Sequence, residues 1–340
     1  MNASPAHDPR LHWVQADWLA EATAWIHERL EEQRTSITGE LEQLHVRWWS
    51  TVIRVPTGES HLWFKAAAPV HAFEAPLALL LQRLQPGRVP KLVASDTERG
   101  WMLMRDGGTR LRELMRSPAD LARWEEVLAG YADFQLALAP HADALLEAGV
   151  PDERLATLPG RVERLLDDDE ALLLGRPDEG ITPGEREQLR ALLPELRATA
   201  RDLAALGLPE TLQHDDFHDG NVFVRDGRYL FFDWGDSCVS HPFHTLVVTF
   251  RSLAHGFGLD PGGSELTRLR AAYLEPFSPY GSADDLVAAT ELAHVTGTAA
   301  RALAWHRFVS SREAEFRADD AEAVPYGLKR LLDLGPLGSY

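Results

Sequence analysis

A polar segment followed by two short apolar stretches, all within residues 212–234, constrains the fold of this chain most strongly. The polar segment is rich in histidine and aspartate, and the stretches at 222–224 and 229–232 are β-branched or aromatic. Between them lies Asp226-Gly227, a dipeptide typical of two-residue hairpin turns. The segment therefore predicts a β-hairpin preceded by a polar loop.

The predicted hairpin would bring polar side chains together at its open end. Asn221 begins the first strand, Asp233 follows the second, and Asp216 lies in the preceding loop. Carboxylate and amide oxygens are hard ligands of the kind that Mg²⁺ prefers. Two acids and an amide in this arrangement can hold a divalent cation and activate a hydroxyl group.

The same residues carry a family resemblance. The pattern His214-x-Asp216-x-x-x-x-Asn221, followed by Asp233-Trp234, is similar to the catalytic and metal-binding loops of the aminoglycoside phosphotransferase and choline kinase family, a group of protein-kinase-like enzymes. The resemblance implies an α+β, bilobal protein-kinase-like fold. Its small lobe would contain mostly antiparallel strands and one key helix, and its large lobe would be mainly helical.

Hydrophobic periodicity divides the 340 residues in a way that suits two lobes. Residues 1–37 predict an N-terminal helical segment that packs on the small lobe. Residues 38–106 predict the small nucleotide-binding lobe, with a helix, Glu74–Leu84, after its third strand. Residues 107–340 predict the large helical lobe, which would include the catalytic loop and the hairpin at 212–237. The five strands are expected at 40–46, 50–55, 61–66, 91–94 and 101–104. Helices of the large lobe are expected through 124–138, 246–255, 264–273, 283–308 and 326–334, with two or three more within 151–206.

Phosphoryl transfer needs charge to be neutralised and two oxygens to be held in line. Carried over from the family, Asp216 is the catalytic base, which accepts a hydrogen bond from the substrate hydroxyl. Asn221 and Asp233 are the Mg²⁺ ligands. His214 supports the catalytic loop. His218 could support the loop as well, or lie near the nucleotide phosphates or the substrate.

Lys65 is the only lysine or arginine of its predicted strand. A charge on a half-buried strand needs a partner, and Glu74 at the start of the next helix is the candidate. Paired with Glu74, Lys65 would reach the α- and β-phosphates of ATP or another nucleoside triphosphate, as the strand lysine does in kinases.

Other nucleotide contacts are expected at the edges of the small lobe. Ser50 would contact phosphate, although residues 45–51 contain no glycine and the Gly-x-Gly-x-x-Gly pattern is absent. Met104 and Asp106 fall where the adenine edge would meet the backbone of the hinge between the lobes.

The chain departs from the family pattern at three positions. Asp215 stands where the family usually has glycine, and His241 and His244 replace two acids, the second of which normally braces the catalytic loop. Asp236, downstream of the metal-binding aspartate, would face substrate or metal, or else the surface.

Composition excludes several classes of partner. The net charge of −18 argues against nucleic acid and anionic membranes, and it is compatible with a cationic substrate or simply with a well-solvated surface. A single cysteine, Cys238, excludes an internal disulfide framework and fits a cytoplasmic location. We expect neither a secretory signal nor a membrane span.

Three functions remain open from the sequence. The first is a kinase that uses ATP and Mg²⁺ to phosphorylate a hydroxyl of an aminoglycoside, amino sugar, choline-like amine or related metabolite. The second is a nucleotide-binding pseudokinase or regulatory module. The third is a phosphohydrolase that binds a metal through pairs such as His214-Asp215 and His218-Asp219.

Overall fold

The computed structural model describes residues 11–58, 60–176, 178–311 and 320–339. Residues 1–10 of the predicted N-terminal segment lie outside the described residues. The chain forms two compact units, called here the first and the second unit. The first unit is Met1–Gly108 with Val224–Gly235, and the second is Thr109–Phe223 with Asp236–Tyr340.

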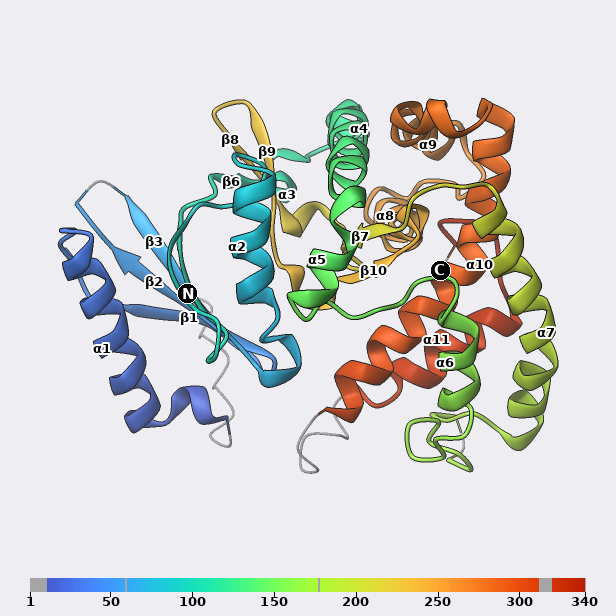
Figure 1. Cartoon of the computed structure of the whole chain (residues 1–340), viewed down its shortest axis with the longest axis horizontal. Helices are drawn as coiled ribbons and strands as arrows, with labels where there is room; N and C mark the ends of the chain where they lie inside the picture. Colours follow the sequence, from blue (N-terminus) through green and yellow to red (C-terminus); the bar gives the residue numbers. More distant parts are fainter. Residues whose placement is uncertain (1–10, 59, 177, 312–319, 340) are drawn as a thin grey trace. The chain divides into compact units, whose positions relative to one another are not determined.

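A five-stranded antiparallel sheet in the order β1-β2-β3-β5-β4 forms the centre of the first unit. Two helices cover its opposite faces (Figure 1). Trp25 of the first helix packs against Phe64 and Trp101, whereas Ala75 of the second packs against Met102. The elements are α1 (Ala16–Glu32), β1 (Glu42–Val46), β2 (Ser50–Pro56), β3 (His61–Ala67), α2 (Glu74–Leu84), β4 (Leu92–Asp96) and β5 (Trp101–Arg105).

The segment 224–235 belongs to the first unit, although it falls within the range 107–340 that was predicted for the large lobe. Backbone contacts explain the difference. Phe231 donates its N–H to the carbonyl of Arg88 over 2.8 Å, and the Arg225 guanidinium donates to the carbonyl of Asp106. Gly108 has a φ of +96° and packs so closely on the backbone of Val224 that no Cβ fits there.

The predicted hairpin consists of β8 (Val222–Arg225) and β9 (Arg228–Phe231). Asp226 and Gly227 connect the strands with φ values of +51° and +73°. Two successive positive φ angles define the type I′ turn that matches the twist of paired strands. The boundary between the two units falls within β8.

The second unit is mainly helical, and its longest helix, α10, packs against α6, α7, α8 and α11. Gly297 and Gly327 permit these close packings, because a Cβ at either position would lie within 3.4 Å of neighbouring atoms. The elements are β6 (Thr109–Arg110), α3 (Leu111–Leu114), α4 (Leu121–Leu138), α5 (Ala142–Glu147), α6 (Leu158–Leu165), α7 (Pro183–Ala205), β7 (Thr211–Gln213), β10 (Cys238–Ser240), α8 (Thr245–Phe257), α9 (Ser264–Leu274), α10 (Ala283–Ser310) and α11 (Ala323–Leu332).

The α+β prediction is confirmed: an antiparallel sheet with one helix after its third strand is followed by mainly helical chain. Within the described ranges, no helix combines the length and the apolar character that crossing a membrane requires.

Candidate active site

The first unit holds a buried ion-pair cluster of one lysine and two carboxylates. Strand β3 places Lys65 opposite Met102, on the sheet face that α2 covers. The Lys65 Nζ donates to Glu74 Oε1 over 2.7 Å and to Asp233 Oδ1 over 2.6 Å. Glu74 is 3% exposed, so its charge is balanced within the protein.

Burial and charge oppose each other in this cluster. Burial alone would lower the pKa of Lys65, but the Asp233 and Glu74 carboxylates raise it above its ordinary value. Lys65 is therefore a stable cation. The Glu74 Oε1 also accepts the backbone N–H of Trp234 over 3.1 Å, which ties the segment after β9 to α2. The Asp233 carboxylate stays 46% exposed, so part of it can serve a cation.

The predicted catalytic loop lies in the second unit, between β7 and β8. The stacking of Phe217 on Tyr131, with ring centroids 4.1 Å apart, anchors this loop on α4. Asn221 Nδ2 donates to the Asp216 carbonyl over 3.0 Å and to Asp216 Oδ2 over 3.2 Å. The amide nitrogen is thus used inside the loop, and the amide oxygen is the atom suited to a cation.

His218 is fixed next to Asp216. Its Nδ1 accepts the Gly220 backbone N–H over 2.9 Å, so Nε2 carries the ring hydrogen of the neutral imidazole. That Nε2 lies 3.3 Å from Asp216 Oδ2. Burial would raise the pKa of the Asp216 carboxyl, but the His218 hydrogen bond and the charge of Arg301 hold it below its usual range. Asp216 is therefore ionised at neutral pH.

Arg301, which was not predicted from the sequence, joins three acids of the second unit. From α10, its guanidinium lies 3.1 Å from Asp215 Oδ2, 3.4 Å from Asp236 Oδ2 and 3.7 Å from Asp216 Oδ1. Asp236, predicted from the sequence to face substrate, metal or the surface, is thus paired with Arg301. The sequence does contain an indication of this role. Arg301 is the only Asp, Glu, Lys or Arg between Glu291 and Arg307, and a lone charge in an apolar stretch is buried only when it is paired.

His244 replaces the bracing acid with a neutral hydrogen-bonding group. Its Nδ1 lies 2.9 Å from Ser240 Oγ and its Nε2 lies 2.8 Å from Thr296 Oγ1. Burial lowers the pKa of His244 to about 3. Thr296 belongs to α10, as Arg301 does, so this helix supports the loop region at two points.

The loop itself contains two more buried polar residues. Asp215 adopts a φ of +60°, which is the conformation that glycine would favour at this position, and the Gln213 side chain holds it there. His214 is fully buried beside Phe217, at a centroid distance of 5.6 Å, a position suited to support of the loop.

The expected nucleotide contacts all lie in the first unit. Ser50 begins β2 and is buried, and Met104 lies in β5 beside the Ala75 cluster. The Asp106 carboxylate accepts hydrogen bonds from Trp63 Nε1 (2.8 Å) and the Gly108 N–H (2.7 Å). Its side chain therefore fixes the turn after β5.

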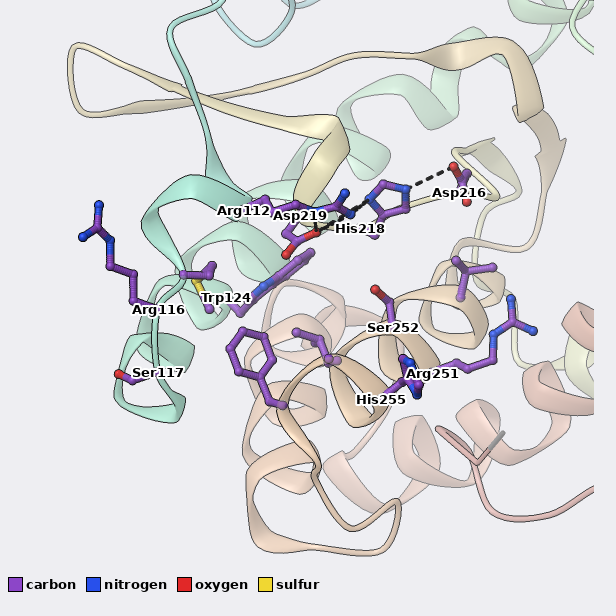
Figure 2. A pocket seen from close by; sticks show the side chains of 15 residues that line it. Arg112, Arg116, Ser117, Trp124, Asp216, His218, Asp219, Arg251, Ser252 and His255 are labelled. Atoms are coloured by element: carbon purple, nitrogen blue, oxygen red, sulfur yellow. Dashed lines mark hydrogen bonds and ion pairs between the residues drawn. The ribbon is translucent and has the colours of Figure 1, made fainter. Parts of the chain in front are cut away.

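A cavity of about 740 Å³ opens beside Asp216 within the second unit (Figure 2). Residues of α3, α4, α8 and the catalytic loop line it, including Trp124, His218 and Ser252. Such a volume is typical of small-molecule sites. In the part of the chain that the structure describes, no three His, Cys, Asp or Glu residues gather as a metal site.

Comparison with solved structures defines the class of this fold. It is similar to an ethanolamine kinase from Plasmodium vivax (TM-score 0.60, 15% identity, 94% of this chain and 89% of that chain). It is also similar to the choline kinase LicA from Streptococcus pneumoniae (TM-score 0.55, 13% identity, 91% and 99%). A third match is the aminoglycoside phosphotransferase APH(4)-Ia in a ternary complex with AMP-PNP and hygromycin B (TM-score 0.56, 15% identity, 91% and 98%). The fold is that of the small-molecule kinases.

The model of the phosphotransferase enzyme family matches residues 47–286. The chain therefore belongs to this family, as its loop motifs suggested, and it is a phosphotransferase. No curated protein matches it in sequence.

Proposed function

We propose that this protein transfers the γ-phosphate of ATP to a hydroxyl group of a small molecule in a Mg²⁺-dependent reaction. The observation that carries the proposal is the buried cluster of Lys65 with Glu74 and Asp233, at 2.7 and 2.6 Å. Lysine held in this way presents a permanent cation to nucleotide phosphates. A pseudokinase has no physical need for this cluster together with an ionised Asp216.

The remaining parts follow from the chemistry of each side chain. Asp216 orients the acceptor hydroxyl and receives its hydrogen bond. The Asn221 amide oxygen and the exposed part of the Asp233 carboxylate are suitable Mg²⁺ ligands. When bound, Mg²⁺ would neutralise charge on the phosphates.

The similar proteins indicate the kind of substrates to test. One of them was solved with AMP-PNP and hygromycin B, and others are choline and ethanolamine kinases. We propose ATP as the donor and a free small molecule as the acceptor. We also propose a cytoplasmic location, since the chain has a single cysteine, which is buried.

The test is ATP consumption with Mg²⁺ and a panel of acceptors. The panel contains amino alcohols, amino sugars, aminoglycosides and phosphorylated or carboxylated counterparts of the simpler alcohols. We expect Asp216→Asn to lower kcat on a validated acceptor by about 10²–10⁴-fold. Asp226→Asn, at the exposed turn of the hairpin, is the matched control and keeps wild-type turnover.

Two results would contradict the proposal. Wild-type turnover by Asp216→Asn would show that another residue is the base. ATP binding without transfer to any acceptor would favour the pseudokinase.

A further inference from the structure

The cavity beside Asp216 carries more positive than negative side chains. Its two carboxylates, Asp216 and Asp219, are already engaged, since Asp219 lies 2.8 Å from the Arg112 guanidinium and Asp216 contacts His218. The basic residues that line it are Arg112, Arg116, Arg251, His218 and His255 (Figure 2).

A second cavity of about 240 Å³ lies between α8, α10, α11 and the C-terminal segment. Its lining includes Arg251, Arg301, Arg330 and His294. No Asp or Glu is among the described residues that line it. Arg251 lines both cavities, and Arg301 contacts Asp216, so the second cavity adjoins the proposed catalytic base through these two arginines.

Two arginines of the second cavity, Arg301 and Arg330, are held in fixed positions. Arg330 donates to the Ser339 carbonyl over 2.9 Å and to Ser339 Oγ over 3.2 Å. Arg301 lies over the Trp305 ring, 5.2 Å from its centroid. Burial, reinforced by the charge of Arg330, lowers the pKa of His294 to about 4, so His294 is a neutral hydrogen-bonding group. Guanidinium groups fixed in this way match the geometry of carboxylate and phosphate oxygens.

This lining is opposite to the charge of the chain as a whole. The protein has 52 Asp and Glu against 34 Lys and Arg. An ammonium-bearing acceptor would need carboxylates or open aromatic faces around its charge. Aromatic residues do line both cavities, but the carboxylates of the first are already engaged and the second has none among its described lining residues, so arginines dominate the charge of both linings.

We propose that the acceptor is a hydroxyl compound that also carries an anionic group, a phosphate or a carboxylate, and that Arg251 and Arg330 bind this group in the smaller cavity. The inference rests on the proposed function and specifies its substrate class. The acidic composition was compatible with a cationic substrate; the lining of the cavities favours an anionic one instead.

The first test measures binding without turnover, with inorganic phosphate as the probe in calorimetry and thermal shift. We expect Arg251→Met and Arg330→Met each to weaken phosphate binding at least tenfold. Arg330→Gln provides a second variant if the methionine form does not fold. Arg197→Met, a surface arginine of α7 paired with Glu163, is the matched control and binds as wild type does. Equal phosphate affinity in all variants would overturn the proposal.

The second test compares neutral or cationic alcohols with their phosphate and carboxylate counterparts as acceptors. We expect the anionic member to have at least a tenfold higher kcat/KM, and Arg330→Met to raise its KM without raising the KM for ATP. Transfer to cationic alcohols alone would overturn this inference and leave the proposed function standing. Transfer to no acceptor would overturn both.

Discussion

At the scale of single residues, the buried lysine of β3 is stable only because its partners are present. Replacing Lys65 with methionine leaves Glu74 buried without a countercharge. We expect Lys65→Met to lower the free energy of unfolding by about 3–5 kcal/mol, the usual cost of breaking a buried pair. The double variant Lys65→Met/Glu74→Gln removes both charges and should recover most of that loss. Urea unfolding measures this, and a double variant less stable than the single one would contradict the assignment.

His244 predicts a dependence of stability on pH. Its pKa is about 3 when folded and near its ordinary 6.5 when unfolded, so between these values the unfolded chain binds the extra proton. Stability is therefore complete above pH 6.5 and is lost as the pH falls, by up to about 1.4 kcal/mol per pH unit. In His244→Gln the unfolded chain no longer takes up this proton, so the free energy of unfolding should fall less steeply as the pH falls. Urea unfolding at pH 7.5 and 5.5 measures this change in the free energy of unfolding. The same change in the wild type and in His244→Gln would refute the prediction.

The sequence predicts the site residues that belong to a local pattern. Asp216, Asn221 and Asp233 are predicted because their spacing along the chain is itself the signal. Lys65 and Glu74 are predicted because a lone charge on a strand requires a partner. Arg301 lies 85 residues from Asp216 in sequence, and only the packing of α10 brings their side chains together. No local pattern encodes that contact.

At the scale of elements, replacing a glycine with alanine should have opposite effects on stability in two helices. A Cβ on Gly297 of α10 would lie 2.8 Å from Val247 Cγ2 and 3.1 Å from His244 Cδ2. We expect Gly297→Ala to lower the free energy of unfolding by about 1–3 kcal/mol, because overpacking outweighs the better helix propensity. Gly256 of α8 has no atom within 4 Å of such a Cβ, so Gly256→Ala should stabilise by up to ~1 kcal/mol. Thermal or urea unfolding distinguishes the two, and equal effects would show that the α8–α10 contact is loose.

Element boundaries followed periodicity closely where one face is buried. The helix Glu74–Leu84 was predicted with its observed ends, and the strands shifted by one or two residues. Periodicity does not indicate that residues 224–235 contact the first unit, because the contacts of the hairpin are with the backbone at Arg88, Asp106 and Gly108. Backbone N–H and C=O groups make these contacts, and because nearly every residue has them, the contacts leave no pattern in the sequence.

At the scale of the whole molecule, the proposed parts divide between the two units, and their effects should separate. Lys65, Glu74 and Asp233 belong to the first unit, and Asp216 to the second. Mg²⁺-ATP at 100 times its Kd should stabilise the wild type by about 2.7 kcal/mol. The stable double variant Lys65→Met/Glu74→Gln should lose most of this gain, because the cation for the phosphates is absent. Asp216→Asn should keep it while losing transfer, since its carboxylate serves the acceptor. Thermal shift with ATP, with and without EDTA, measures the difference, and loss of the shift in Asp216→Asn would place that residue in nucleotide binding instead.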